Sequence, residues 1–339
     1  MAANIFFLPG LLGSNIGYIP PDGSAFQPCW MDLPAILHGD LKYLQLSADA
    51  SGPGPLAEGR TLSASGVFGP AYTPFLLAMS VFGFNAVGCG FDWRQPIMSN
   101  ANATAAAAIA SFGDSPFWII GHSMGGVLAL QVYSLLVAQG RGSQVAGVIT
   151  ICAPHYGSFE IVRLFNRLPL TYTSIVIASG WSDFVSGTPG PSYIDATVST
   201  WPGIYELLPF AASGPLWASD PAQAASLYSI FTYPKGNPNL ETNLFAAAKT
   251  SQSLFAPAGP SGKTYCIAGI GFTTYYSLSG QGDLNTDAGY LSTLAGDGEV
   301  TVAEASLAGA PVTLTLTTHG LACLNPLVWE LVYDIVAAG

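Results

Sequence analysis

The chain has 339 residues, of which 50% are hydrophobic and only 9% charged; 9 basic and 20 acidic residues give a net charge of −11. The few Lys and Arg residues are scattered, which argues against nucleic acid or an anionic membrane surface as a partner. No run of about 18 uninterrupted apolar residues occurs, so no transmembrane segment is expected, although transient contact with a lipid surface stays open. The apolar composition suits a neutral, greasy ligand as well as a large core.

Strand and helix patterns alternate through the first half of the chain. Such alternation predicts a mostly parallel central sheet with helices on both faces. A turn-rich segment at 14–60 interrupts the pattern, and a long loop inside a compact domain predicts a lid-like excursion. The expected strands are 4–8, 84–89, 117–121 and 145–151, and the expected helices are 72–82, 99–112 and 124–138.

The first expected strand runs into a glycine-rich loop, Pro9-Gly10-Leu11-Leu12-Gly13. In enzymes with a serine nucleophile, a loop after an early strand supplies one backbone N–H to the oxyanion hole. Leu11 is the natural donor here and Leu12 the second choice. A plain connection between a strand and a turn is the alternative.

The strand at 117–121 leads into Gly121-His122-Ser123-Met124-Gly125, which is followed by an apolar helical pattern. This is the arrangement of a nucleophile elbow, in which a serine sits on a sharp turn between strand and helix with its hydroxyl exposed. Side chains at positions 121 and 125 would crowd that turn. We therefore predict Ser123 as the nucleophile and the Met124 amide as the second oxyanion donor; a structural loop is the alternative.

After the strand at 145–151 the pattern changes. Residues 158–261 are aromatic and punctuated by Pro and Gly, and strand patterns resume at 264–270 and 312–318, followed by a helix at 324–338. We interpret 1–157 and 262–339 as one core and 158–261 as a cap inserted into it.

The position of His319 predicts the general base. It directly follows the last expected strand, so it can reach the rim of the sheet where Ser123 emerges. The alternative is a histidine in a loop that only makes structural hydrogen bonds. The other three histidines, His38, His122 and His155, lie too early in the chain or inside the elbow.

The segment Ala295-Gly296-Asp297-Gly298-Glu299 places a carboxylate in a tight turn ahead of the histidine strand. Asp297 would accept a hydrogen bond from the imidazole and stabilise the imidazolium. Asp283, Asp287 and Glu299 are rivals, and a turn aspartate bonded to its own backbone is the alternative.

Several motifs in this order resemble the lecithin:cholesterol acyltransferase-like branch of the α/β-hydrolases. The resemblance spans nearly the whole chain. The motifs are Pro9-Gly10-Leu11-Leu12-Gly13-Ser14, Phe91-Asp92-Trp93-Arg94, Gly121-His122-Ser123-Met124-Gly125-Gly126, Ala153-Pro154-His155-Tyr156-Gly157-Ser158, Trp201-Pro202-Gly203-Ile204-Tyr205-Glu206-Leu207-Leu208-Pro209, Gly296-Asp297-Gly298-Glu299-Val300 and His319-Gly320.

The resemblance implies an α/β-hydrolase fold with a lid and a cap. It implies Ser123, Asp297 and His319 as the triad and Leu11 and Met124 as the oxyanion donors. Trp30 resembles the lid tryptophan that touches the acyl chain in relatives; simple aromatic packing in a loop is the alternative. Leu12 is a further candidate for contact with the substrate.

The chain departs from this branch in three places. Glu299 and Thr301 stand where the family usually has Thr and Pro, and Trp201-Pro202-Gly203 replaces Phe-Pro-Ser. The short-range lid disulfide of the animal enzymes cannot form, because the cysteine after Cys29 is Cys89. These departures leave acyl and acceptor preference open.

The five cysteines are widely spaced and show no ligand pattern with histidine, so neither a metal nor another cofactor is expected. Their odd number favours a reducing compartment. The chain enters its first strand directly after Met1-Ala2-Ala3, which leaves no room for a signal peptide. We therefore expect a cytoplasmic protein, or a secreted one if a signal peptide has been removed.

Together these features predict a serine carboxylic-ester hydrolase, an esterase or lipase, acting on apolar acyl esters through an acyl-enzyme. A phospholipase A or an acyltransferase that moves the acyl group to an alcohol is the alternative within the enzyme class. A non-catalytic ligand-binding relative is the alternative outside it. Acyl-chain length, thioester or lactone activity and oligomeric state stay open.

Overall fold

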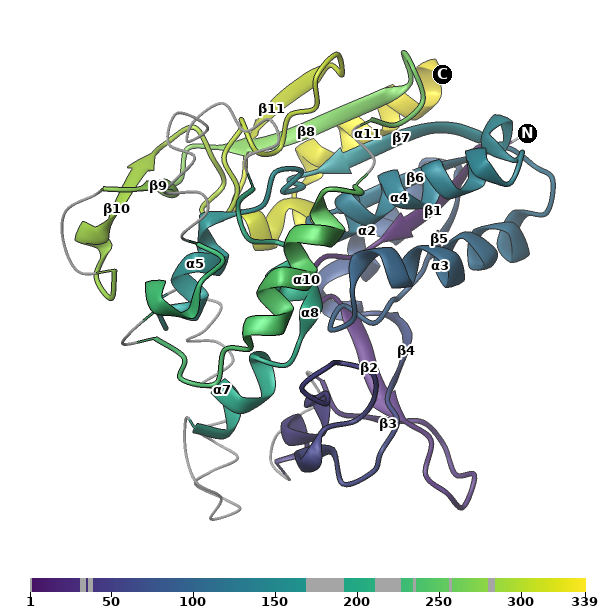
Figure 1. Ribbon diagram of the computed structural model, residues 1–339. Helices are drawn as coiled ribbons and strands as arrows, with labels where there is room; N and C mark the ends of the chain where they lie inside the picture. Colours follow the sequence, from purple (N-terminus) through teal and green to yellow (C-terminus); the bar gives the residue numbers. More distant parts are fainter. Residues whose placement is uncertain are drawn as a thin grey trace.

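A computed structural model of the protein describes residues 2–30, 35, 39–168, 192–210, 227–233, 236–255, 258–279 and 284–339. Its centre is a six-stranded sheet in the order β11-β8-β7-β6-β1-β5 in which every neighbouring pair is parallel (Figure 1). The strands are β1 (Asn4–Leu8), β5 (Asn85–Gly88), β6 (Phe117–His122), β7 (Val145–Ile151), β8 (Thr264–Ile270) and β11 (Val312–Leu316).

Helices cover both faces of this sheet. Side chains of α3 and α4 pack with Phe6 and Leu8 of β1 in one core cluster, whereas α2 and α11 pack with Ile5 and Phe7 in the other. Successive residues of a strand point to opposite faces, so burial on both sides explains why the inner strands β1, β6 and β7 are mostly apolar. The helices are α2 (Gly69–Val81), α3 (Ile97–Phe112), α4 (Met124–Ala138) and α11 (Pro326–Ala338).

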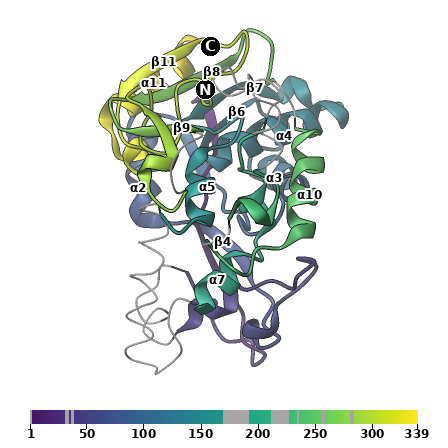
Figure 2. The ribbon, with the colours of Figure 1, turned by 60° about the vertical axis from the view of Figure 1, so that its left-hand side comes forward.

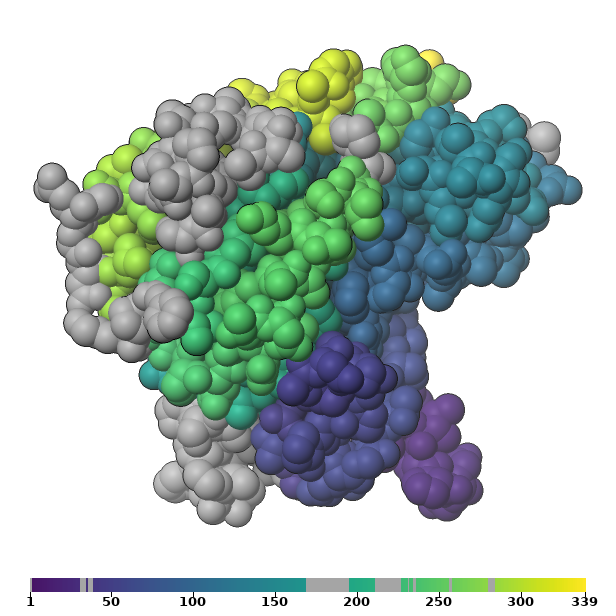
Figure 3. Space-filling model, in the orientation of Figure 1, coloured from purple at the N-terminus to yellow at the C-terminus, as the bar shows by residue number. Residues whose placement is uncertain are grey.

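The excursion after β1 forms a second, antiparallel sheet in the order β3-β2-β4, built from β2 (Ser14–Tyr18), β3 (Gln27–Pro28) and β4 (Ser63–Val67). In the space-filling view its dark blue and purple atoms lie at one end of the molecule, and the dark blue atoms adjoin the green region that contains α10 (Thr242–Gln252) (Figure 3). The Asn243 side chain of α10 donates a hydrogen bond to the Ala48 carbonyl. This excursion therefore packs against the segment that follows β7.

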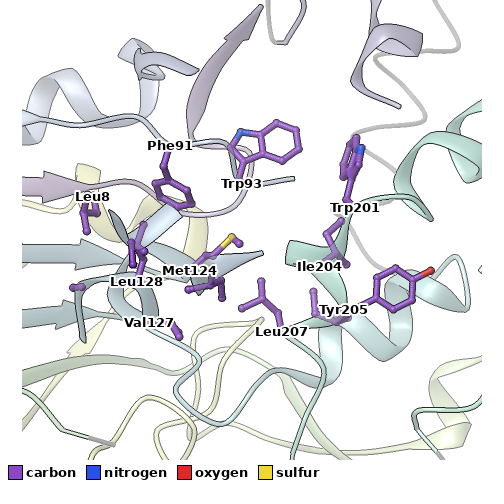
Figure 4. Packing of buried hydrophobic residues seen from close by; sticks show 14 of the residues in the cluster. Leu8, Phe91, Trp93, Met124, Val127, Leu128, Trp201, Ile204, Tyr205 and Leu207 are labelled. Atoms are coloured by element: carbon purple, nitrogen blue, oxygen red, sulfur yellow. The ribbon is translucent and has the colours of Figure 1, made fainter. Parts of the chain in front are cut away.

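The segment after β7 carries α5 (Phe159–Phe165), α7 (Ser192–Val198), α8 (Pro202–Tyr205) and α10. Its core is continuous with that of the sheet: Trp93 and Met124 lie between Leu128 of α4 and Trp201 and Ile204 at α8 (Figure 4). A hairpin of β9 (Thr274–Leu278) and β10 (Tyr290–Thr293) lies beside α5 in both ribbon views (Figures 1 and 2).

The predicted fold class is confirmed. Three strands, 4–8, 145–151 and 264–270, and the helix at 124–138 have the predicted bounds. The last strand ends at Leu316, earlier than predicted, and a 3-10 helix, η6 (His319–Leu324), precedes α11. The β9–β10 hairpin was not predicted. In the described ranges, no helix combines the length and apolarity needed to cross a membrane.

Candidate active site

Ser123 occupies the turn between β6 and α4. Its backbone has φ 53° and ψ −128°, a region that side-chain-bearing residues rarely adopt, and its amide donates to the Ile151 carbonyl at 2.9 Å. The flanking glycines permit the turn: a Cβ at Gly121 would lie 2.2 Å from the Gly125 carbonyl oxygen, and one at Gly125 2.3 Å from the Pro9 oxygen. The local sequence thus forces the hydroxyl onto a tight, strained corner.

The structure brings the three predicted triad residues into one hydrogen-bonded chain. His319 Nε2 lies 2.7 Å from Ser123 Oγ, and His319 Nδ1 lies 2.9 Å from Asp297 Oδ2. The second carboxylate oxygen of Asp297 accepts from the amides of Glu299 (2.9 Å) and Val300 (2.7 Å). The His319 amide also donates to the Asp297 carbonyl, so side-chain and backbone hydrogen bonds together hold His319 against Asp297.

The opposite charges of Asp297 and His319 shift the pKa values of these two residues in opposite directions. Burial alone would raise the pKa of Asp297, but the neighbouring His319 charge and the donated hydrogen bonds outweigh it, so the pKa lies below its ordinary value. Burial would lower the pKa of His319, and the carboxylates of Asp297 and then Glu299 outweigh it and raise the pKa. Asp297 is therefore an anion that stabilises an imidazolium on His319.

The backbone amides of Leu11 and Met124 adjoin Ser123 and donate no hydrogen bond within the described residues. Met124 is the first residue of α4, where the helix leaves its N–H groups without an intrahelical acceptor. Leu11 and Leu12 line the cavity beside Ser123, and Leu12 has a left-handed backbone with φ 63°. Two unused donors next to a serine hydroxyl are suited to binding an oxyanion.

The loop that carries Leu11 is held by contacts from distant segments. The Gly13 carbonyl accepts from the Phe68 amide at 2.8 Å, and the Leu12 carbonyl accepts from the Trp30 indole at 2.6 Å. Trp30 is only 5% exposed, packs edge-on against Trp93, and is not among the residues that line the cavity. This placement favours aromatic packing over acyl-chain contact for Trp30.

A buried network centred on His122 ties three loops of the site together. Burial lowers the pKa of His122 to about 3, so its ring is neutral. His122 Nε2 faces the His319 carbonyl at 3.1 Å and must carry the proton; Nδ1 therefore accepts from the Tyr72 hydroxyl at 3.0 Å. The Tyr72 oxygen in turn accepts from the Gly10 amide at 2.9 Å. The loop at residues 9–13, the elbow and the His319 loop thus share one chain of hydrogen bonds.

A cavity of about 230 Å³, here named the acyl cavity, opens beside Ser123. Most of its wall is apolar, and α5 and the segment after α8 complete it on the side away from the sheet. The apolar wall residues are Leu11, Leu12, Phe68, Ala71, Pro154, Ile161, Leu164, Leu207 and Val300.

None of the other sequence candidates in the described residues hydrogen-bonds to His319 Nδ1. Asp287 binds Arg163 at 2.8 Å, and Glu299 approaches His319 from the opposite side, with its carboxylate 3.8 Å from Nε2. His155 is buried against Thr150. Rival candidates Asp283 and His38 fall outside the described residues.

Two residues of the site were missed by sequence reasoning. Tyr72 lies on α2 and Glu160 on α5, and both line the acyl cavity. Tyr72 lies in a helical stretch whose sequence gives no sign of its hydrogen bond to Gly10. Glu160 lies in the predicted cap, for which the sequence predicted no site residue. Among the described residues no cluster of acidic, His and Cys side chains suits a metal, and the five cysteines form no disulfide.

Comparison with known proteins agrees with this architecture. No curated protein matches the chain in sequence. The solved structure of the Tle4–Tli4 complex is similar over 99% of this chain and 98% of that chain, with a TM-score of 0.60 and 14% identity. Bacillus licheniformis lipase BlEst2 in mature form matches with a TM-score of 0.40 and 13% identity over 99% and 92% of the two chains. The metagenomic carboxyl esterase MGS0156 matches with a TM-score of 0.39 and 12% identity over 99% and 74%.

The family match rests on the sequence itself. Residues 59–261, more than half of the chain, match the alpha/beta hydrolase family. This stretch contains the elbow and the helices on either side of it. The chain therefore belongs to the alpha/beta hydrolase family.

Proposed function

We propose that this protein is a serine carboxylic-ester hydrolase that acts through an ester intermediate on Ser123. The observation that carries the proposal is the continuous chain from Ser123 Oγ through His319 to Asp297, with distances of 2.7 and 2.9 Å. Such a chain beside two unused backbone donors fits acyl transfer. The order of its motifs supports membership of the lecithin:cholesterol acyltransferase-like branch.

The chemistry follows from the roles of these groups. His319 Nε2 takes the Ser123 proton as the oxygen attacks the ester carbonyl, and the Leu11 and Met124 amides bind the resulting oxyanion. Collapse breaks the bond to the alcohol, which leaves with the proton from Nε2. Water then attacks the acyl-enzyme with His319 again as the base, and the acid is released. Asp297 keeps the imidazole oriented and stabilises its charged form.

The acyl cavity supports a preference for short to medium acyl groups. An apolar cavity of about 150 Å³ holds one benzene ring, so about 230 Å³ admits an acyl chain of roughly eight carbons. The segment 158–261 acts as a cap, because Ile161, Leu164 and Leu207 close this cavity. A transient lipid contact is compatible with such a site.

A p-nitrophenyl ester series from about C2 to C16 tests the proposal. Wild type, Ser123→Ala and the exposed control Ser115→Ala are compared, with and without a long-chain alcohol. We expect a maximum in kcat/KM at about C4 to C8, retained in Ser115→Ala and lost in Ser123→Ala. Activity that survives in Ser123→Ala would refute the mechanism, and accumulation of the alcohol ester would assign the protein to acyl transfer.

A further inference from the structure

A second cavity, of about 500 Å³, adjoins the acyl cavity. The two share Glu160, Glu299, His319 and Gly320, but Ser123 lines only the acyl cavity. The second cavity is therefore larger and lies beyond His319. The rest of its wall comes from α5, from the chain at the start of β9, from the turn that carries Asp297 and from the residue before His319. These wall residues are Arg163, Phe272, Thr273, Tyr275, Asp297, Gly298 and Thr318.

The geometry of ester cleavage assigns a part of the substrate to each cavity; this step rests on the proposed function. The carbonyl oxygen must reach the Leu11 and Met124 amides, which places the acyl chain in the acyl cavity. The departing oxygen must receive its proton from His319 Nε2. The alcohol part consequently extends past His319, where the second cavity begins.

Glu299 lies at the junction of the two cavities, and His319 is the only basic side chain near its carboxylate among the described residues. Its carboxylate lies 3.8 Å from His319 Nε2 and its side chain is 40% exposed. Within the described part of the chain no Arg or Lys pairs with it, and its carboxylate oxygens accept no hydrogen bond. An ionised carboxylate that no Arg or Lys neutralises, beside a leaving group, acts on any charge that the alcohol carries.

The nearby cation does not cancel this charge. Arg163 binds Glu160 at 2.9 Å and Asp287 at 2.8 Å, and its guanidinium stacks over Tyr275 at 3.7 Å from the ring centre. Two carboxylates thus already neutralise one guanidinium, and the arginine is only 7% exposed. With the Asp297–His319 pair beside it, the second cavity is net negative.

We propose that the second cavity binds the alcohol part of the ester, and that Glu299 makes it selective for alcohols with a positive charge, such as amino alcohols. Alcohols bearing phosphate, sulfate or carboxylate are rejected. Phospholipids with a net negative head group and acyl donors carrying phosphates are accordingly poor substrates.

Three butyrate esters that differ in the charge of the alcohol test this inference. They are the esters of choline, of its uncharged isostere 3,3-dimethylbutanol, and of 3-hydroxypropanesulfonate. At low salt and about pH 8, we expect kcat/KM to fall about threefold at each step from cation to neutral to anion, as for one charge roughly 6 Å away in a nearly aqueous setting. In Glu299→Gln the ratio between choline and neutral esters should approach one, and high salt should reduce it in wild type.

Glu330→Gln on the exposed face of α11 removes the same charge far from the site and should leave the ratio unchanged. A wild-type ratio near one, faster cleavage of the anionic ester, or a ratio that persists in Glu299→Gln overturns the inference. p-Nitrophenyl butyrate separates the two proposals. If it is cleaved through Ser123 while the ratio is near one, only the charge selection fails; if it is not cleaved at all, both fail.

Discussion

Replacing Tyr72 by Phe tests whether the buried network holds the site in its working geometry. The change removes a single oxygen, which accepts from the Gly10 amide at 2.9 Å and donates to His122 Nδ1 at 3.0 Å. A buried polar group left without a partner costs about 1–3 kcal/mol, so two such groups should lower the free energy of unfolding by about 2–6 kcal/mol. Gly10 precedes Leu11, and loss of one oxyanion donor lowers kcat by about 10²–10³; a displaced donor should lower it about tenfold.

Urea unfolding and ester hydrolysis measure the two effects separately. We expect kcat to fall much more than KM changes, because the oxyanion forms only in the transition state. Tyr265→Phe is the matched control, since this half-buried hydroxyl makes no hydrogen bond in the described residues. If Tyr72→Phe retained the stability and kcat of that control, the network would have no positioning role.

Three further predictions concern the same site. In Glu299→Gln the acid limb of the plot of kcat/KM against pH should move to lower pH by just under one unit. The reason is that a charge 3.8 Å from His319 Nε2 in a nearly aqueous setting stabilises the imidazolium by about 1 kcal/mol. An acid limb that stays in place, measured relative to the alkaline plateau, would contradict this. Gly125→Ala should lower the melting temperature strongly, whereas Gly52→Ala, whose Cβ meets nothing, should not; equal effects in thermal unfolding would count against the elbow argument. Trp30→Phe removes the donor to the Leu12 carbonyl and should lower kcat severalfold with little change in KM for any chain length; a KM that rises with acyl length would instead mean that Trp30 contacts the acyl chain.

Local patterns in the sequence predicted the elements that carry the site. The strand before Ser123 is buried on both faces, so its sequence is an almost unbroken apolar run. The glycines on either side of Ser123 are present because a side chain there would clash within the same turn. These signals involve neighbours in sequence. The fold class and the position of the elbow could therefore be predicted.

Tertiary contacts account for what the sequence left open. Choosing among Asp287, Asp297 and Glu299 depends on which carboxylate meets His319 Nδ1, and Asp287 instead meets Arg163, which lies on α5. The role of Tyr72 depends on a bond to Gly10 across 62 positions. Neither contact produces a pattern in the sequence, so composition and residue spacing could name candidate residues but could not choose among them.

Labelling with a fluorophosphonate, located by peptide mass spectrometry, tests the central claim that Ser123 is an activated nucleophile. The account predicts one adduct per chain on the peptide that contains Ser123, retained in Ser115→Ala, absent in Ser123→Ala and formed far more slowly in His319→Asn. An adduct on another residue, or labelling that survives in Ser123→Ala, would contradict it.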